Sequence, residues 1–147
     1  MSRKKAREIA LHLVFELGFN TEDAAELVKN RLDEDAMQSI RGEIALYEET
    51  FSEKQRAYIL DAVQGVAAHR AELDELIEQN AKGWSMKRIS RMTMSILRLA
   101  LYEMQYVQDV PVGAAINEAV ELAKTYETED TGAFVNGILG AVGRAQA

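Results

Sequence analysis

The chain has 147 residues, of which 48% are hydrophobic and 28% charged, with a formal net charge of −7, a composition typical of a single soluble globular domain. It has no cysteine, which excludes disulfides and thiolate metal sites, and His12 and His69 are too far apart in sequence to form a metal-ligand motif. The sequence contains no apolar run long enough to span a membrane and no secretory signal at its start, so we expect a cytoplasmic protein without a membrane partner.

The first half of the chain has the spacing of apolar residues that is typical of helices. A first helix is expected from about Ser2 to Leu17, and a short second helix from Thr21 to Leu32. Residues 52–55, with the sequence Ser-Glu-Lys-Gln, have the pattern of a capping box. They predict the start of a long helix that bends near His69.

The second half continues the helical pattern after an interruption at residues 82–85. The next helix, from about Met86 to Val107, is apolar almost all round between Ile96 and Leu101, which indicates a central, buried helix. Pro111 predicts the start of another helix, and a last helix is expected from about Thr131 to Val142. The chain is therefore predicted to be all-α, with about seven helices in one domain, residues 1–147, made of two packed bundles over about 1–80 and 84–147.

Arg98 is a single charge inside the most apolar run of the chain. An unpaired charge there would be very costly, so Arg98 must find a carboxylate partner. The candidates are Glu103, Glu118 and Glu121. Arg98 is therefore predicted to be architectural, and no metal site is expected at the two glutamates on the later helix, because no Glu-x-x-His motif accompanies them.

Basic residues cluster at the start of the chain, where residues 3–7 hold four bases and no acid. At 100° per residue, Lys4, Arg7, Leu11 and Phe15 share a stripe outside the main apolar arc. Cations backed by an aromatic ring suit single-stranded RNA, because cations meet phosphates and a ring can stack on a base. The alternative is a frayed, solvated helix start, and the residues alone do not decide between the two.

Several stretches together resemble one known family. They are Ala6–Glu8 after the bases, Ile96–Glu103, Val110–Val112, Ile116–Lys124, Glu129–Asp130 and Phe134–Leu139. This pattern is similar to that of the transcription antitermination factor NusB family and spans nearly the whole chain. The resemblance implies an all-helical fold of two small bundles.

The resemblance also implies an RNA-binding site. The residues that it and the basic start assign to this site are Arg3, Lys4, Lys5, Arg7, Phe15, Tyr126, Asp130 and Phe134. Without the resemblance, Tyr126 and Phe134 are better explained by packing at helix edges. Ala133 stands where relatives commonly have a base, which weakens the expected phosphate contact.

The implied function is that of a non-enzymatic factor that binds single-stranded boxA-type RNA of ribosomal operons. With the ribosomal protein NusE it would make the elongating RNA polymerase resist termination. NusE would dock on the second bundle near the helix that begins at Arg88, although Thr93 replaces an acid frequent in relatives. No cofactor, metal or catalytic residue is expected, since the chain shows no triad or phosphate-loop pattern. The sequence leaves open whether the protein is a monomer or a homodimer.

Two other functions compete with this one. The RNA-binding accessory domain of ribosomal-RNA cytosine methyltransferases has the same fold, but a chain ending at Ala147 is expected to have no room for a catalytic domain. A structural helical adaptor without an RNA role would leave the clustered bases at residues 3–7 unexplained.

Overall fold

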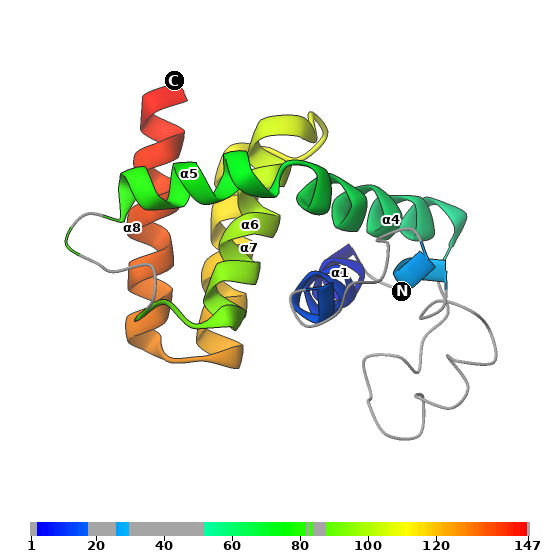
Figure 1. Cartoon of the computed structure of the whole chain (residues 1–147), viewed down its shortest axis with the longest axis horizontal. Coiled ribbons are helices and arrows are strands. Elements are labelled where there is room, and N and C mark those ends of the chain that lie inside the picture. The colour runs from blue at the N-terminus through cyan, green and yellow to red at the C-terminus, as the bar shows by residue number, and fades with distance from the viewer. Residues whose placement is uncertain (1–2, 18–25, 30–51, 82, 84–87, 147) are drawn as a thin grey trace. The chain divides into compact units, whose positions relative to one another are not determined.

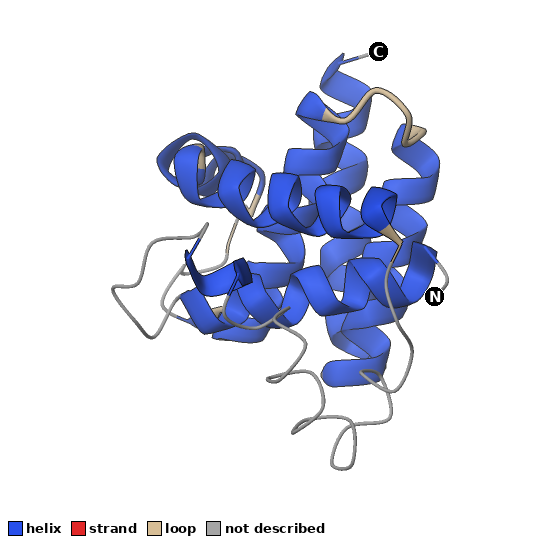
Figure 2. Ribbon diagram, turned by 90° about the vertical axis from the view of Figure 1, so that its right-hand side faces the viewer, coloured by secondary structure: helices blue, strands red, loops and turns tan. Residues whose placement is uncertain are grey.

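The computed structural model describes residues 3–17, 26–29, 52–81, 83 and 88–146, and every regular element in these ranges is helical (Figure 2). The all-α prediction is confirmed. The chain divides into two compact units, residues 1–67 and 68–147. The division falls near the end of the first long helix after residue 52, whereas the sequence pattern placed it after residue 80.

The first unit contains α1 (Arg3–Leu17) and nearly all of α4 (Glu53–Ala68), shown in Figure 1. The predicted capping box opens α4, because the Gln55 N–H donates to Ser52 Oγ (3.1 Å) and the Ser52 N–H donates to Gln55 Oε1 (2.9 Å). Of the predicted second helix, residues 26–29 are helical, and the rest lies outside the described residues.

The second unit contains α5 (Arg70–Asn80), α6 (Arg91–Tyr106), α7 (Val112–Tyr126) and α8 (Glu129–Gln146). Helices α6, α7 and α8 pack on one another, and α5 packs across α6 and α8 (Figure 1). The fully buried side chains of α6 include Ile96, Leu97, Leu99 and Leu101. This confirms the prediction of a central, buried helix.

Side-chain caps set the ends of α6 and α8. Ser90 Oγ accepts the Thr93 N–H (3.0 Å), so α6 starts at Arg91, later than the expected start at Met86, a residue that lies outside the described ranges. Thr128 Oγ1 accepts the Thr131 N–H (3.1 Å) in the same way. Helix α8 consequently starts at Glu129, two residues earlier than expected.

Arg98 joins α6 to α5 through a bidentate ion pair. Its Nε donates to Asp74 Oδ1 (2.7 Å) and its Nη2 donates to Asp74 Oδ2 (3.0 Å). The prediction that Arg98 has a carboxylate partner is confirmed, but the three glutamates proposed as candidates are wrong. The partner lies on another helix, which sequence spacing within α6 and α7 could not indicate.

An aromatic cluster secures the start of α5 against the end of α6. The Tyr106 hydroxyl donates to the Glu72 carboxylate, 2.8 Å from each oxygen, and the His69 ring stacks on Tyr106 with ring centres 4.3 Å apart. The hydrogen bond to Glu72 raises the pKa of Tyr106.

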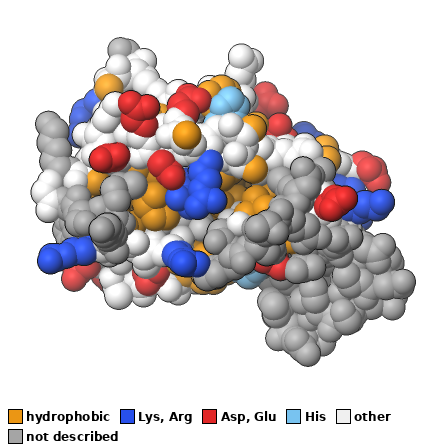
Figure 3. Space-filling model, viewed as in Figure 1, with side chains coloured by type: hydrophobic (Ala, Val, Ile, Leu, Met, Phe, Trp, Pro, Cys, Tyr) orange, Lys and Arg blue, Asp and Glu red, His pale blue; other side chains and the backbone are white. Residues whose placement is uncertain are grey.

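Acidic side chains gather along α5 in Figure 3, so this helix turns a negative face to solvent.

Helices α7 and α8 approach closely at Gly132. A Cβ atom there would lie 2.9 Å from Lys124 Cγ, so the buried glycine permits this approach. The approach fixes the short turn between the two helices.

In the part of the chain described, no helix is sufficiently long and apolar to cross a bilayer.

Candidate functional site

The basic start occupies the first turns of α1. Arg3 and Lys4 are exposed and Lys5 is half-buried, and the first turn holds no acidic residue. Cations at a helix N-terminus oppose the helix dipole, so helix stability does not account for their position. Exposed cationic groups of this kind are what a phosphate backbone contacts.

Arg7 is placed differently from Arg3 and Lys4. Its exposed fraction is only 4%, and that of Leu11 is 0%. The prediction that Arg7 and Leu11 lie outside the buried side of α1 is wrong. The buried part of the helix surface extends beyond the single apolar stripe that the sequence pattern indicates. A buried guanidinium needs partners within the protein, and Arg7 has such interactions.

The last turns of α1 carry His12 and Phe15, both half-buried. Burial lowers the pKa of His12, and the nearby Glu8 carboxylate opposes this effect. Because Phe15 is half-buried, its ring keeps part of its surface accessible, as an aromatic beside RNA must.

The turn between α7 and α8 holds the other predicted residues. Tyr126 and Phe134 are half-buried, and Asp130 is exposed in the first turn of α8. The side chain that caps α8 is that of Thr128 and not that of Asp130. A carboxylate in the first turn still interacts favourably with the helix dipole. Ala133 is exposed beside Phe134.

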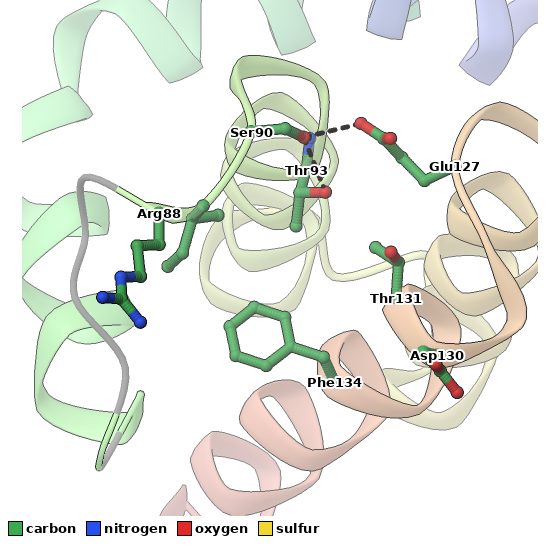
Figure 4. Close-up of a pocket in the computed structure, with 8 residues that line it drawn as sticks. Arg88, Ser90, Thr93, Glu127, Asp130, Thr131 and Phe134 are labelled. Carbon is green, nitrogen blue, oxygen red and sulfur yellow. Dashed lines mark hydrogen bonds between the residues drawn. The ribbon is translucent and has the colours of Figure 1, made fainter.

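A cavity of about 200 Å³ lies between the start of α6 and the start of α8 (Figure 4). The residues that line it are Arg88, Ile89, Ser90, Thr93, Glu127, Asp130, Thr131 and Phe134. The structure thus brings together two predicted residues, Asp130 and Phe134, whereas Tyr126 is not among the lining residues. The Phe134 ring faces the hollow, and Thr93 lies across from it (Figure 4).

A hydrogen-bonded chain of side chains borders this cavity. Ser90 Oγ donates to Glu127 Oε1 (2.6 Å) and is also hydrogen bonded to Thr93 Oγ1 (2.9 Å). A serine has one hydroxyl proton, and the carboxylate is the stronger acceptor, so the proton is directed to Glu127. The Glu127 carboxylate is therefore held in place at the edge of the cavity.

The sequence pattern did not indicate Ser90 and Glu127 as residues of this site. The Ser-x-x-Thr spacing before α6 could have revealed Ser90 as a helix cap. No sequence signal connects it to Glu127, which is 37 positions away and meets it only because α6 and α7 pack together.

The basic start of α1 lies in the first unit, and the aromatic residues near the C-terminus lie in the second. The sequence predicts that they meet at one RNA site. That meeting stays a prediction. In the basic stretch around Trp84, Arg88 and Arg91 are exposed, whereas Lys82, Trp84 and Lys87 lie outside the described residues. Within the described ranges, no three His, Cys, Asp or Glu side chains are grouped as a metal site would require.

Comparison with known proteins gives consistent matches over nearly the whole chain. The model of the NusB family matches residues 4–144. A transcription antitermination protein NusB from Acetivibrio thermocellus is 43% identical over 142 residues, covering 97% of this chain and 88% of the relative.

Solved structures share the fold. A structure of T. maritima NusB has a TM-score of 0.74 and 30% identity, covering 98% of this chain and 92% of that one. A crystal structure of the antitermination factors NusB and NusE in complex with double-stranded RNA has a TM-score of 0.75 and 24% identity, covering 97% and 96%.

Proposed function

The chain belongs to the NusB family, and from that premise we propose that it is a transcription antitermination factor that binds single-stranded boxA-type RNA. The observation that carries the proposal is the full-length match to proteins of that name. The family is one of non-enzymatic RNA-binding factors, so no catalytic residue is proposed. A factor with this function would act in the cytoplasm.

The exposed cations of α1 support the RNA-binding part of the proposal. Arg3, Lys4 and Lys5 would neutralise phosphates, and Phe15, Tyr126 and Phe134 would provide ring surfaces for bases. Asp130, exposed on the same turn as the cavity, would restrain affinity by repelling phosphates. Arg7 would act from within α1 by holding its start in shape, since its side chain is buried.

The proposed protein partner is the ribosomal protein NusE, acting with the elongating RNA polymerase. A solved protein of the same fold is in complex with NusE and RNA, and family membership extends that partnership to this chain. The start of α6 is the proposed docking region. Thr93 is buried in that region, so the contact with NusE would be made by exposed side chains beside it, such as Arg91.

The rival functions are less well supported. The relatives named as antitermination proteins match over nearly their own full length, which does not favour an accessory domain of a methyltransferase. A purely structural adaptor does not account for exposed cations at an unfavourable helix end.

The proposal is tested by fluorescence anisotropy with a boxA-like RNA and a scrambled RNA of the same composition, each with and without purified NusE. We expect tighter binding to the boxA-like RNA and a further gain with NusE. Light scattering on the same samples decides between monomer and homodimer. Equal and weak binding to both RNAs, unchanged by NusE, would contradict the proposed function.

A further inference from the structure

We propose that the cavity between α6 and α8 takes one unpaired guanine base, and that Glu127 is the residue that selects it. This inference rests on the proposed function and adds the base that the second unit reads. It is carried by the shape of the cavity, the ring of Phe134 and the fixed carboxylate of Glu127.

The size and walls of the cavity suit a single base. Its volume, about 200 Å³, is below the roughly 300–1,000 Å³ of pockets that hold drug-sized ligands. Phe134 supplies an aromatic face, and Thr93 and Thr131 border the space beside it (Figure 4). Single-stranded RNA offers unstacked bases that stack on such rings. Arg88, exposed at the rim, supplies a cation for the flanking phosphates.

The carboxylate of Glu127 makes the cavity selective. An ionised carboxylate only accepts hydrogen bonds. The Watson–Crick edge of guanine presents two adjacent donors, N1–H and the N2 amino group, which match the two carboxylate oxygens. Adenine and cytosine place a ring nitrogen lone pair beside their single amino group, and uracil has two carbonyls around one N–H. Each of these three bases therefore sets a lone pair against the carboxylate.

Ser90 holds the Glu127 carboxylate in a fixed orientation before a base binds. The hydrogen bond from Ser90 Oγ is 2.6 Å long and uses Glu127 Oε1. A carboxylate oxygen accepts more than one hydrogen bond, so both oxygens retain lone pairs for a ligand. Because the side chain is already held, less rotational freedom is lost when a base binds.

A structural role alone is the competing explanation, because the same hydrogen bond ties the α7–α8 turn to the start of α6. The two explanations differ in what they require. The tie needs one acceptor, which a glutamine also provides. Selection of guanine needs two acceptors, and a glutamine replaces one of them with a donor.

The test measures fluorescence anisotropy of the full chain with three 12-nucleotide RNAs: all uridine, uridine with one central guanosine, and uridine with one central inosine. The uniform flanks let the RNA slide until the purine reaches the cavity. Inosine keeps N1–H and lacks the N2 amino group. We expect the guanosine RNA to bind about tenfold more tightly than the all-uridine RNA, with inosine in between.

Glu127→Gln should reduce the ratio of guanosine to uridine affinity to less than about twofold. The matched control is Glu129→Gln, which removes one negative charge from the same turn at an exposed side chain. Both variants should raise affinity for the all-uridine RNA by a similar factor, so only the ratio of guanosine to uridine affinity separates them. If Glu127→Gln does not fold, Glu127→Asp keeps the charge, withdraws the carboxylate, and should also lower the ratio.

The inference is wrong if Glu127→Gln has the melting temperature and the tenfold ratio of the parent protein. It is also wrong if the parent binds the all-uridine RNA and gains nothing from guanosine, or binds the inosine RNA as tightly as the guanosine RNA. Failure of the parent to bind boxA-like RNA would instead contradict the proposed function itself.

Discussion

The start of α1 and the cavity between α6 and α8 are two different kinds of surface. The first has exposed cations and no acidic residue in its first turn. The second has an aromatic ring, hydroxyl groups and a fixed carboxylate around a small hollow, with Arg88 at its rim. Point charges attract any phosphate backbone, whereas a shaped polar hollow distinguishes bases. We therefore expect affinity and selectivity to reside in different units and to be separable by mutation.

The largest expected effect is on overall RNA affinity. Replacing Arg3, Lys4 and Lys5 together with glutamine should weaken RNA binding about a hundredfold at low salt, because about three phosphate contacts are lost. In the parent protein these contacts should contribute roughly −2.1 to the slope of log affinity against log salt for a single strand. Titrations at four salt concentrations measure this slope.

The same triple variant should keep the ratio of guanosine to uridine affinity, since the cavity is untouched. Arg7→Gln is the control within the same helix. Its buried side chain predicts a lower melting temperature and little change in the salt slope. A triple variant with the parent slope would remove the start of α1 from the RNA site.

The next effect concerns the stability of the second unit. Arg98→Ala should lower the free energy of unfolding by about 2 kcal/mol, because it leaves Asp74 without its bidentate partner at a site that is largely buried. Chemical denaturation measures this loss. RNA affinity of the folded protein should not change, which would show that a cation of the second unit serves architecture.

Asp74→Asn and the double variant complete a mutant cycle with Arg98→Ala. The coupling between the two positions should account for most of the loss in either single variant. If Arg98→Ala unfolds like the parent but loses RNA affinity, Arg98 belongs to the RNA surface.

Much of the fold could be predicted from local signals in the sequence. The capping box at residues 52–55 and the break at His69 are found where the pattern indicated. The buried run of α6 follows from its apolar residues. These features depend on neighbours within one helical turn, which a sequence displays directly.

The site was harder to predict because its key contacts are tertiary. Glu127 meets Ser90, and Asp74 meets Arg98, across helix interfaces that no spacing rule reveals. The burial of Arg7 was also missed, since a helical wheel assumes one apolar face and α1 is covered more widely. Family resemblance identified Phe134, but not the cavity in front of it.

Phe15 lies on α1 and Phe134 lines the cavity, so the same substitution at both positions compares the two regions directly. Each change to alanine should cost roughly 1–3 kcal/mol of RNA affinity if the ring stacks on a base. Phe134→Ala should also abolish the preference for guanosine, whereas Phe15→Ala should weaken all RNAs equally. Anisotropy and thermal melting are measured on the same samples. A large melting loss with preserved RNA affinity would assign the ring to the core.

The smallest effect is a pH dependence of stability in the first unit. Burial lowers the pKa of His12 below its ordinary value of 6.5, so the unfolded chain takes up a proton before the folded chain does. The free energy of unfolding should then fall as the pH drops from about 6.5 toward the lower folded pKa, and it should be fully retained above 6.5. His12→Gln should remove this contribution to the slope.

Glu8→Gln sharpens the same measurement, because the Glu8 carboxylate raises the pKa of His12 against the effect of burial. Without that carboxylate the folded pKa should fall further, and the loss of stability on acidification should become steeper in Glu8→Gln than in the parent. Denaturation midpoints across this pH range, measured for the parent and both variants, test the order of the three slopes. If the three slopes coincide, His12 is solvated in the folded protein, and the later turns of α1 are less buried around His12 than the structure indicates. In that case the contrast between a charged, exposed first turn and a packed remainder of α1 would no longer hold.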